Sequence, residues 1–250
     1  RDWSSDVCSS DLLYNGNLKI MGRLFGTDGI RGIANKDLTC ELAFKLGQIC
    51  AMEFNSSGHR AQILIGKDTR ASGDMFENAI AAGIASAGGI ARSLGVIPTP
   101  GVAYLTRRYR ADAGIVISAS HNSMEYNGLK VFNSEGYKLA DELEDEIERL
   151  ILSDERTTLP VGPDVGRTES ADSALEDYID FLVSAADYRL EGMKIVLDTA
   201  NGAASRVAPE VFRRLGAEVT AISDRPDGNN INENCGSTHP EELMRTVVET

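Results

Sequence analysis

The feature of this sequence that most constrains its fold is an alternation of helix-type and strand-type segments between residues 38 and 118. Apolar residues at helical spacing predict helices over 38–54, 75–87 and 102–109. Short apolar runs bounded by polar loops predict strands over 62–66, 90–96 and 113–118. Helices that alternate with strands pack on the faces of a sheet, so the pattern predicts a layered α/β fold.

A second, similar pattern follows an acidic amphipathic helix predicted over 141–152. Residues 153–168 contain prolines and glycines with little periodicity, which is typical of a linker or of an excursion at the edge of the first domain. Further on, the same criteria predict helices over 174–186 and 207–215 and strands over 194–197 and 218–222. This second βαβ unit predicts a second α/β domain. A helix that begins at Glu241 is the last predicted element, so we expect this domain to be truncated.

The predicted organisation is therefore four segments. Residues 1–20 are expected to be a non-native tail, because Asp6–Leu12 resembles a translated sequencing adapter and Met21 is a natural start. The tail has no basic and apolar pattern of a signal peptide. The first domain is expected over 21–155, a linker over 156–170 and the truncated second domain over 171–250.

Charge and composition exclude several classes of function. A net charge of -13 argues against a nucleic-acid or membrane-surface partner, because such partners attract basic patches. No apolar run approaches the ~18 residues that a membrane helix needs. The four cysteines form no C-x-x-C pair, so neither a zinc site nor a redox motif is indicated.

The candidate chemistry lies in residues 114–139. An apolar strand runs into the polar loop Ser118–Asn122, and Asn127-Gly128 then predicts a turn. A serine at the end of a buried strand is well placed to act as a nucleophile, although a plain polar turn has the same composition.

The residues around Ser120 favour phosphoryl chemistry over hydrolysis. If the backbone is extended, Ser120 and His121 point to opposite faces, and the G-x-S-x-G elbow is absent. A phosphoryl-carrying serine needs nearby positive charge. Lys130 could supply it, and so could Arg31, which is expected in a loop punctuated by Gly26, Gly29 and Gly32. Asp68 and Arg70 are expected to form a structural salt bridge in their own loop.

Several motifs in order carry a resemblance to a known family. SASHN, NGLKVF and FGTDGIRG are similar to motifs of the α-D-phosphohexomutase superfamily. MGRLFGTDGIRG and NINENCGSTHPE more closely resemble its branch that acts on glucosamine phosphates. The resemblance runs from Met21 to Thr250 and implies three-layer α/β/α domains with a mixed sheet.

The resemblance also implies roles for individual residues. Ser120 would cycle through a phosphoserine whose oxygens bind Mg²⁺, with Ser118 as its neighbour. Lys130 would be a general acid/base, and Arg31 would contact the phosphoryl group. His121 would belong to the catalytic set and, with Asn122, would shape the loop. Ser118 and Asn122 would also help to bind the phosphoryl group. The implied reaction converts glucosamine 6-phosphate to glucosamine 1-phosphate through a 1,6-bisphosphate, in the cytoplasm, for cell-wall precursor synthesis.

The chain departs from the family pattern in two ways. Ser123 and Tyr126 stand where many members have Pro and Asp. The family's metal loop, sugar loop and second phosphate loop are expected beyond Thr250, so we expect a fragment without mutase turnover of its own. A homodimer is a further expectation for the full-length protein. Two alternatives stay open, namely a mutase for mannose or glucose phosphates and a non-catalytic α/β module.

Overall fold

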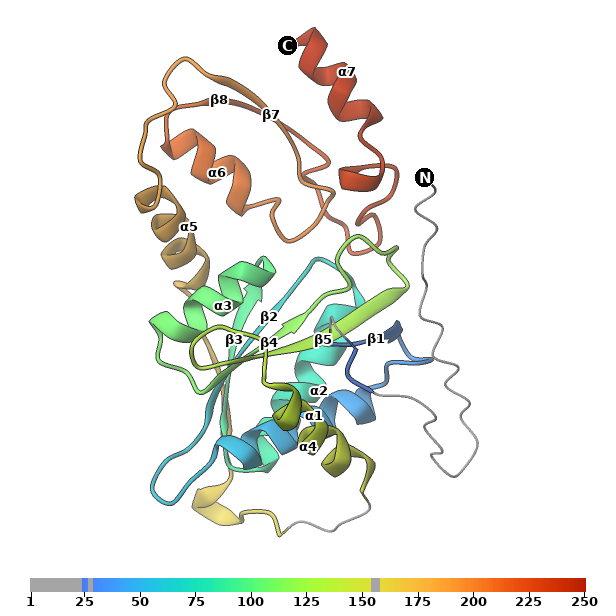
Figure 1. Ribbon diagram of the computed structural model, residues 1–250, viewed down its shortest axis with the longest axis vertical. Coiled ribbons are helices and arrows are strands. Elements are labelled where there is room, and N and C mark those ends of the chain that lie inside the picture. Colours follow the sequence, from blue (N-terminus) through green and yellow to red (C-terminus); the bar gives the residue numbers. More distant parts are fainter. Residues whose placement is uncertain (1–23, 27–28, 154–157) are drawn as a thin grey trace.

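A six-stranded mixed sheet forms the centre of the first half of the chain (Figure 1). The computed structural model describes residues 24–26, 29–153 and 158–250. The expected tail over 1–20 and the natural start at Met21 lie outside these residues. The layered α/β fold and the mixed sheet that the resemblance implied are confirmed.

The sheet has the strand order β1-β5-β4-β2-β3-β6. β2 pairs in parallel with β3 and β4, and β3 with β6, whereas β5 is antiparallel to both β4 and β1. The strands are β1 (Ile30–Ile33), β2 (Gln62–Lys67), β3 (Ile90–Val96), β4 (Ala113–Ile117), β5 (Tyr126–Asn133) and β6 (Arg167–Ser170).

Helices cover both faces of the sheet because its central strands are apolar on both sides. Ile115 and Ile117 of β4 pack into one core cluster, and Val116 between them belongs to the other. Alternate residues of a strand point to opposite faces, so the two clusters are the two faces of one sheet. The first cluster is covered by α1 (Cys40–Phe54), α2 (Ser72–Ser86) and α4 (Asp141–Leu152), and the second by α3 (Thr99–Arg108).

Residues 174–250 form a smaller α/β unit beside α3 (Figure 1). Its two strands pair in parallel, which confirms the predicted βαβ unit. Tyr104 on α3 stacks on Phe181, with ring centroids 3.8 Å apart, and both flank the second core cluster. The elements are α5 (Ala174–Ser184), β7 (Lys194–Asp198), α6 (Val207–Arg214), β8 (Glu218–Ile222) and α7 (Glu241–Glu249).

Three local predictions were wrong. Asn127 and Gly128 do not form a turn but lie inside β5, where Gly128 pairs with Arg31. Arg31 itself was expected in a glycine-rich loop and lies in β1. Within the expected linker, residues 167–170 form β6, because they extend the first sheet beside β3. The domain boundaries themselves stay a prediction.

Among the residues that the structure describes, no helix combines the length and the apolar character needed to cross a membrane.

Candidate active site

The candidate site lies at the point where successive strands are added on opposite sides of β2. From β2 the chain moves to β3 on one side, and it then returns to place β4 on the other side of β2. The loops that follow β2 and β4 therefore leave the same edge of the sheet next to each other. Ligands of open α/β sheets bind at such a switch point, outside the carboxyl ends of the strands.

Ser120 is displayed on the loop that follows β4. Its side chain is exposed, and its φ of +56° is left-handed, a conformation that non-glycine residues rarely adopt. The backbone N–H of Ser120 donates to Ser118 Oγ at 3.2 Å, and that of Asn122 donates to the carbonyl oxygen of Ala119 at 3.2 Å. The assumption of an extended backbone at Ser120 was therefore wrong, and the argument that set His121 on the opposite face does not apply.

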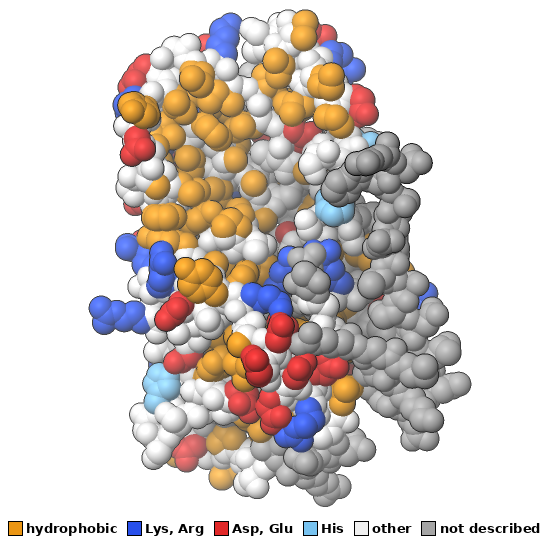
Figure 2. Space-filling model, in the orientation of Figure 1, with side chains coloured by type: hydrophobic (Ala, Val, Ile, Leu, Met, Phe, Trp, Pro, Cys, Tyr) orange, Lys and Arg blue, Asp and Glu red, His pale blue; other side chains and the backbone are white. Residues whose placement is uncertain are grey.

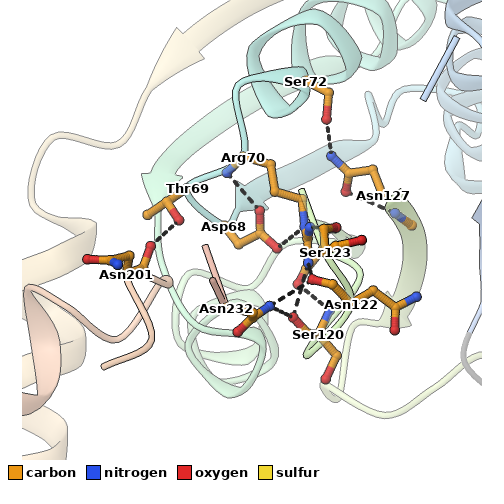
Figure 3. Close-up of polar contacts among 12 residues, drawn as sticks. Asp68, Thr69, Arg70, Ser72, Ser120, Asn122, Ser123, Asn127, Asn201 and Asn232 are labelled. Carbon is orange, nitrogen blue, oxygen red and sulfur yellow. Dashed lines mark hydrogen bonds and ion pairs between the residues drawn. The ribbon is translucent and has the colours of Figure 1, made fainter. Parts of the chain in front are cut away.

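Arg70, on the loop after β2, holds the Ser120 loop through its carbonyl oxygens (Figure 3). Its Nη2 donates to the carbonyls of Ser120 at 3.1 Å and Asn122 at 2.9 Å, and its Nη1 donates to that of Ser123. Its Nε donates to Asp68 Oδ2 at 3.1 Å, which confirms the expected salt bridge. The Arg70 side chain is fully buried and paired with Asp68, so its guanidinium stabilises the protein and does not face a ligand.

A residue of the second α/β unit completes this contact. Asn232 lies between β8 and α7, and its Nδ2 donates to the carbonyl oxygens of Ser120 at 2.9 Å and Asn122 at 2.8 Å. The Ser120 loop is thus held from both halves of the chain (Figure 3).

Arg31 and Lys130 lie on one face of the β1–β5 pair. A Cβ at Gly128 would be 3.1 Å from Arg31 Cγ and 2.8 Å from the carbonyl oxygen of Ser118. A Cβ at Gly29 would be 3.0 Å from Lys130 Cγ. Residues 128 and 130 share a strand face, so the two glycines leave room for two basic stems on the same side, close to Ser118.

Other charges at this edge of the sheet are paired within the protein. Burial would lower the pKa of Lys67, but hydrogen bonds to Asp74 and Glu77 outweigh burial and raise it. A hydrogen bond from the Ser123 side chain lowers the pKa of the exposed carboxyl of Glu125. Lys and Arg side chains gather near mid-height of the face in Figure 2, on a protein whose net charge is -13.

The described ranges contain no group of three or more His, Cys, Asp or Glu side chains that could hold a metal ion. The carboxylates of these ranges therefore do not fit a magnesium site by themselves, because Mg²⁺ in proteins is held through oxygen ligands, chiefly carboxylates.

The sequence pointed to some of these residues and missed others. Ser118, Ser120, Asn122 and the Asp68–Arg70 pair meet at one edge of the sheet, while His121 is exposed on the same loop. The sequence did not predict the hydrogen bonds from Arg70 to the Ser120 loop. It also did not predict those from Asn232. Sequence order gives no signal for a contact between residues 112 positions apart.

Known proteins with similar sequences match almost the whole chain. A phosphoglucosamine mutase from Clostridium beijerinckii is 58% identical over 229 residues, which are 91% of this chain and 51% of that protein. The phosphoglucosamine mutase of Clostridium acetobutylicum is 59% identical over the same shares. The chain thus spans about half the length of the curated relatives it matches.

Solved structures give the same result for the fold. A phosphoglucomutase/phosphomannomutase family protein from Burkholderia thailandensis aligns with 91% of this chain and 49% of its own, at a TM-score of 0.76 and 26% identity. A putative phosphomannomutase from Thermus thermophilus aligns with 90% of this chain and 51% of its own, at a TM-score of 0.75 and 25% identity. The family profile described as "Phosphoglucomutase/phosphomannomutase, alpha/beta/alpha domain I" matches residues 22–158, more than half of the sequence. The chain therefore belongs to the phosphoglucomutase/phosphomannomutase family.

Proposed function

We propose that this chain carries the phosphoserine part of a phosphoglucosamine mutase. The observation that carries the proposal is the exposed Ser120, held in a left-handed conformation on a loop whose carbonyls are fixed by Arg70 and Asn232. Two relatives at 58% and 59% identity bear the name phosphoglucosamine mutase, which supports glucosamine phosphates as the sugar class. Phosphoryl transfer depends mainly on positioning and electrostatics, so a rigidly presented serine beside basic side chains suits it.

In the proposed reaction, phosphorylated Ser120 gives its phosphoryl group to O1 of glucosamine 6-phosphate. The bond from phosphorus to Oγ breaks, a bond from phosphorus to O1 forms, and the proton of the O1 hydroxyl ends on Oγ. Lys130 is the proposed general acid/base for that proton, and Arg31 binds the phosphoryl group. The bisphosphate then turns over so that its O6 phosphoryl group faces Ser120. The bond from phosphorus to O6 breaks, a bond from phosphorus to Oγ forms, and the Oγ proton ends on O6, which leaves glucosamine 1-phosphate and phosphorylated Ser120. Ser118, His121 and Asn122 shape the loop.

Three further parts of the proposal concern cofactor, place and assembly. Mg²⁺ is the proposed cofactor, and the phosphoryl oxygens on Ser120 are the only ligands that we assign to it from this chain. The proposed location is the cytoplasm, for the supply of cell-wall precursors, and a homodimer is the proposed assembly.

Labelled sugar bisphosphates test the sugar class. The complete mutase of which this chain is the proposed phosphoserine part is incubated with the 1,6-bisphosphates of glucosamine, mannose and glucose, each labelled in its phosphoryl groups, and label in the protein is followed over time. We expect label from the glucosamine compound to enter fastest. Faster entry from the mannose or glucose compound would favour the alternative mutases. A protein that takes label from none of them would behave as the non-catalytic module and contradict the proposal.

A further inference from the structure

The side chain of Asn232 does more than touch the Ser120 loop, because its hydrogen-bonding capacity matches the loop. The amide has two N–H hydrogens, and its two bonds go to the carbonyl oxygens of Ser120 and Asn122. The same two oxygens accept from Arg70 Nη2. A carbonyl oxygen has two lone pairs, so each oxygen is saturated only when both Arg70 and Asn232 are in place.

Asn232 is itself held from the end of β7. Its backbone N–H donates to the carbonyl oxygen of Ala200 at 2.9 Å. The carboxylate of Asp198 accepts from the backbone N–H of Ala200 at 2.8 Å and of Gly236 at 2.7 Å, and so joins both flanks of the contact. Asn232 has a φ of +59°, which asparagine tolerates better than most residues. The amide therefore projects from an anchored backbone.

The loop that carries Arg70 is tied to the same unit. Thr69 Oγ1 donates to the carbonyl oxygen of Asn201 at 2.5 Å, and the backbone N–H of Ala71 donates to that of Gly228 at 2.9 Å. Both groups of donors to the Ser120 loop are thus connected to each other, and a displacement of the second unit would move them together.

We propose that Asn232 is a positioning residue that fixes Ser120 for phosphoryl transfer from across the two halves of the chain. This inference rests on the proposed function of Ser120. Without the amide, the carbonyls of Ser120 and Asn122 keep one donor each, and the exposed loop gains freedom. Misplacement of a reacting group by about 1 Å lowers a reaction rate by about 100-fold, so a small displacement of Ser120 is measurable.

Matched variants in one loop test the inference. Asn232→Asp keeps the shape of the side chain but removes both donors, and Asn232→Gly removes the side chain but suits a positive φ. Asn234 is the control, because it is exposed, has a φ of +52° and lies two residues away without a bond to the Ser120 loop. Asn234→Asp and Asn234→Gly are compared with the two Asn232 variants.

Two readouts are recorded for all five proteins. Amide hydrogen exchange of residues 118–123 is expected to be at least about tenfold faster in both Asn232 variants than in the wild type and the Asn234 variants. Labelling of Ser120 by the glucosamine bisphosphate is expected to be at least about tenfold slower in the same two variants. The urea midpoints of matched Asn232 and Asn234 variants should agree, which separates positioning from a general loss of stability.

The readouts separate this inference from the proposed function. Equal exchange in the Asn232 and Asn234 variants would overturn the positioning role, whatever the labelling shows. Faster exchange with wild-type labelling would also overturn it, because the loop would then be freed without consequence. A wild-type chain that takes no label would contradict the proposed function alone, while exchange would still decide whether Asn232 holds the loop.

Discussion

Replacing Arg70 with methionine is expected to lower the free energy of unfolding by about 3–5 kcal/mol, the usual cost of removing one partner of a buried ion pair. The Arg70 side chain is fully buried and Asp68 is 5% exposed, so the carboxylate would be left without its counter-charge. The carbonyl oxygens of Ser120, Asn122 and Ser123 would also lose a donor. Urea unfolding measures the change.

Two further variants set the scale for Arg70. Arg245→Met breaks an exposed pair with Glu242, where the nitrogen–oxygen distance is 3.8 Å, and should cost less than about 1 kcal/mol. The double variant Asp68→Asn with Arg70→Met removes the uncompensated charge and should recover part of the loss. A cost for Arg70→Met no larger than that for Arg245→Met would contradict the role of the buried pair.

Replacing Gly29 with alanine is the second change with a large expected effect, a loss of about 2–5 kcal/mol in the free energy of unfolding. Gly29 has a φ of +83°, and a Cβ there would lie 2.2 Å from the carbonyl oxygen of Leu129. That oxygen belongs to the backbone of β5, so relief of the clash would separate β1 from β5 and shift Arg31 and Lys130. The midpoint of urea unfolding and the rate of Ser120 labelling should both be lower than in the wild type.

Gly58 provides the matched control for Gly29. Its φ is +80°, but a Cβ there would meet nothing within 4 Å. Gly58→Ala therefore carries only the cost of a left-handed alanine, about 1–2 kcal/mol. The difference between the two variants isolates the close contact with β5. Equal losses of unfolding free energy in the two variants would show that the contact between residue 29 and Leu129 is relieved without cost. That result would contradict the close packing of Gly29 against β5.

Much of the fold could be predicted from the sequence because its signals are local. The helical spacing over 141–152 and the apolar run over 218–222 match α4 and β8 in their bounds. Thr39 caps α1 by accepting a hydrogen bond from the backbone N–H of Leu42, and threonine is a favoured residue at that position. These features depend on residues within one or two turns of each other.

What the sequence did not show depends on partners that are distant along the chain. Asn127-Gly128 has the composition of a turn, but pairing with β1 keeps it in β5. The Asn127 side chain is buried, and its Nδ2 donates to Ser72 Oγ at 2.9 Å. β6 is a short polar segment with no strand pattern, and it is a strand only because β3 offers a free edge.

The candidate site also combines residues that a local motif reveals with residues that only distant contacts reveal. Ser120 and its neighbours could be found because they form a contiguous motif, whereas the roles of Arg70 and Asn232 follow from the placement of the two loops. Arg70 was expected to pair only with Asp68, and nothing in the spacing indicated that its Nη atoms meet three carbonyls. The left-handed conformation of Ser120 also has no local signal, because serine rarely adopts it.

Mapping the phosphoryl group after incubation with glucosamine 1,6-bisphosphate shows whether Ser120 is the phosphoryl carrier. The wild-type chain, Ser120→Ala and Ser118→Ala are digested, and the phosphorylated residue is located by mass spectrometry. We expect one phosphoryl group on Ser120 in the wild type and in Ser118→Ala, and none in Ser120→Ala. Phosphate on another residue, or unchanged phosphorylation of Ser120→Ala, would contradict it.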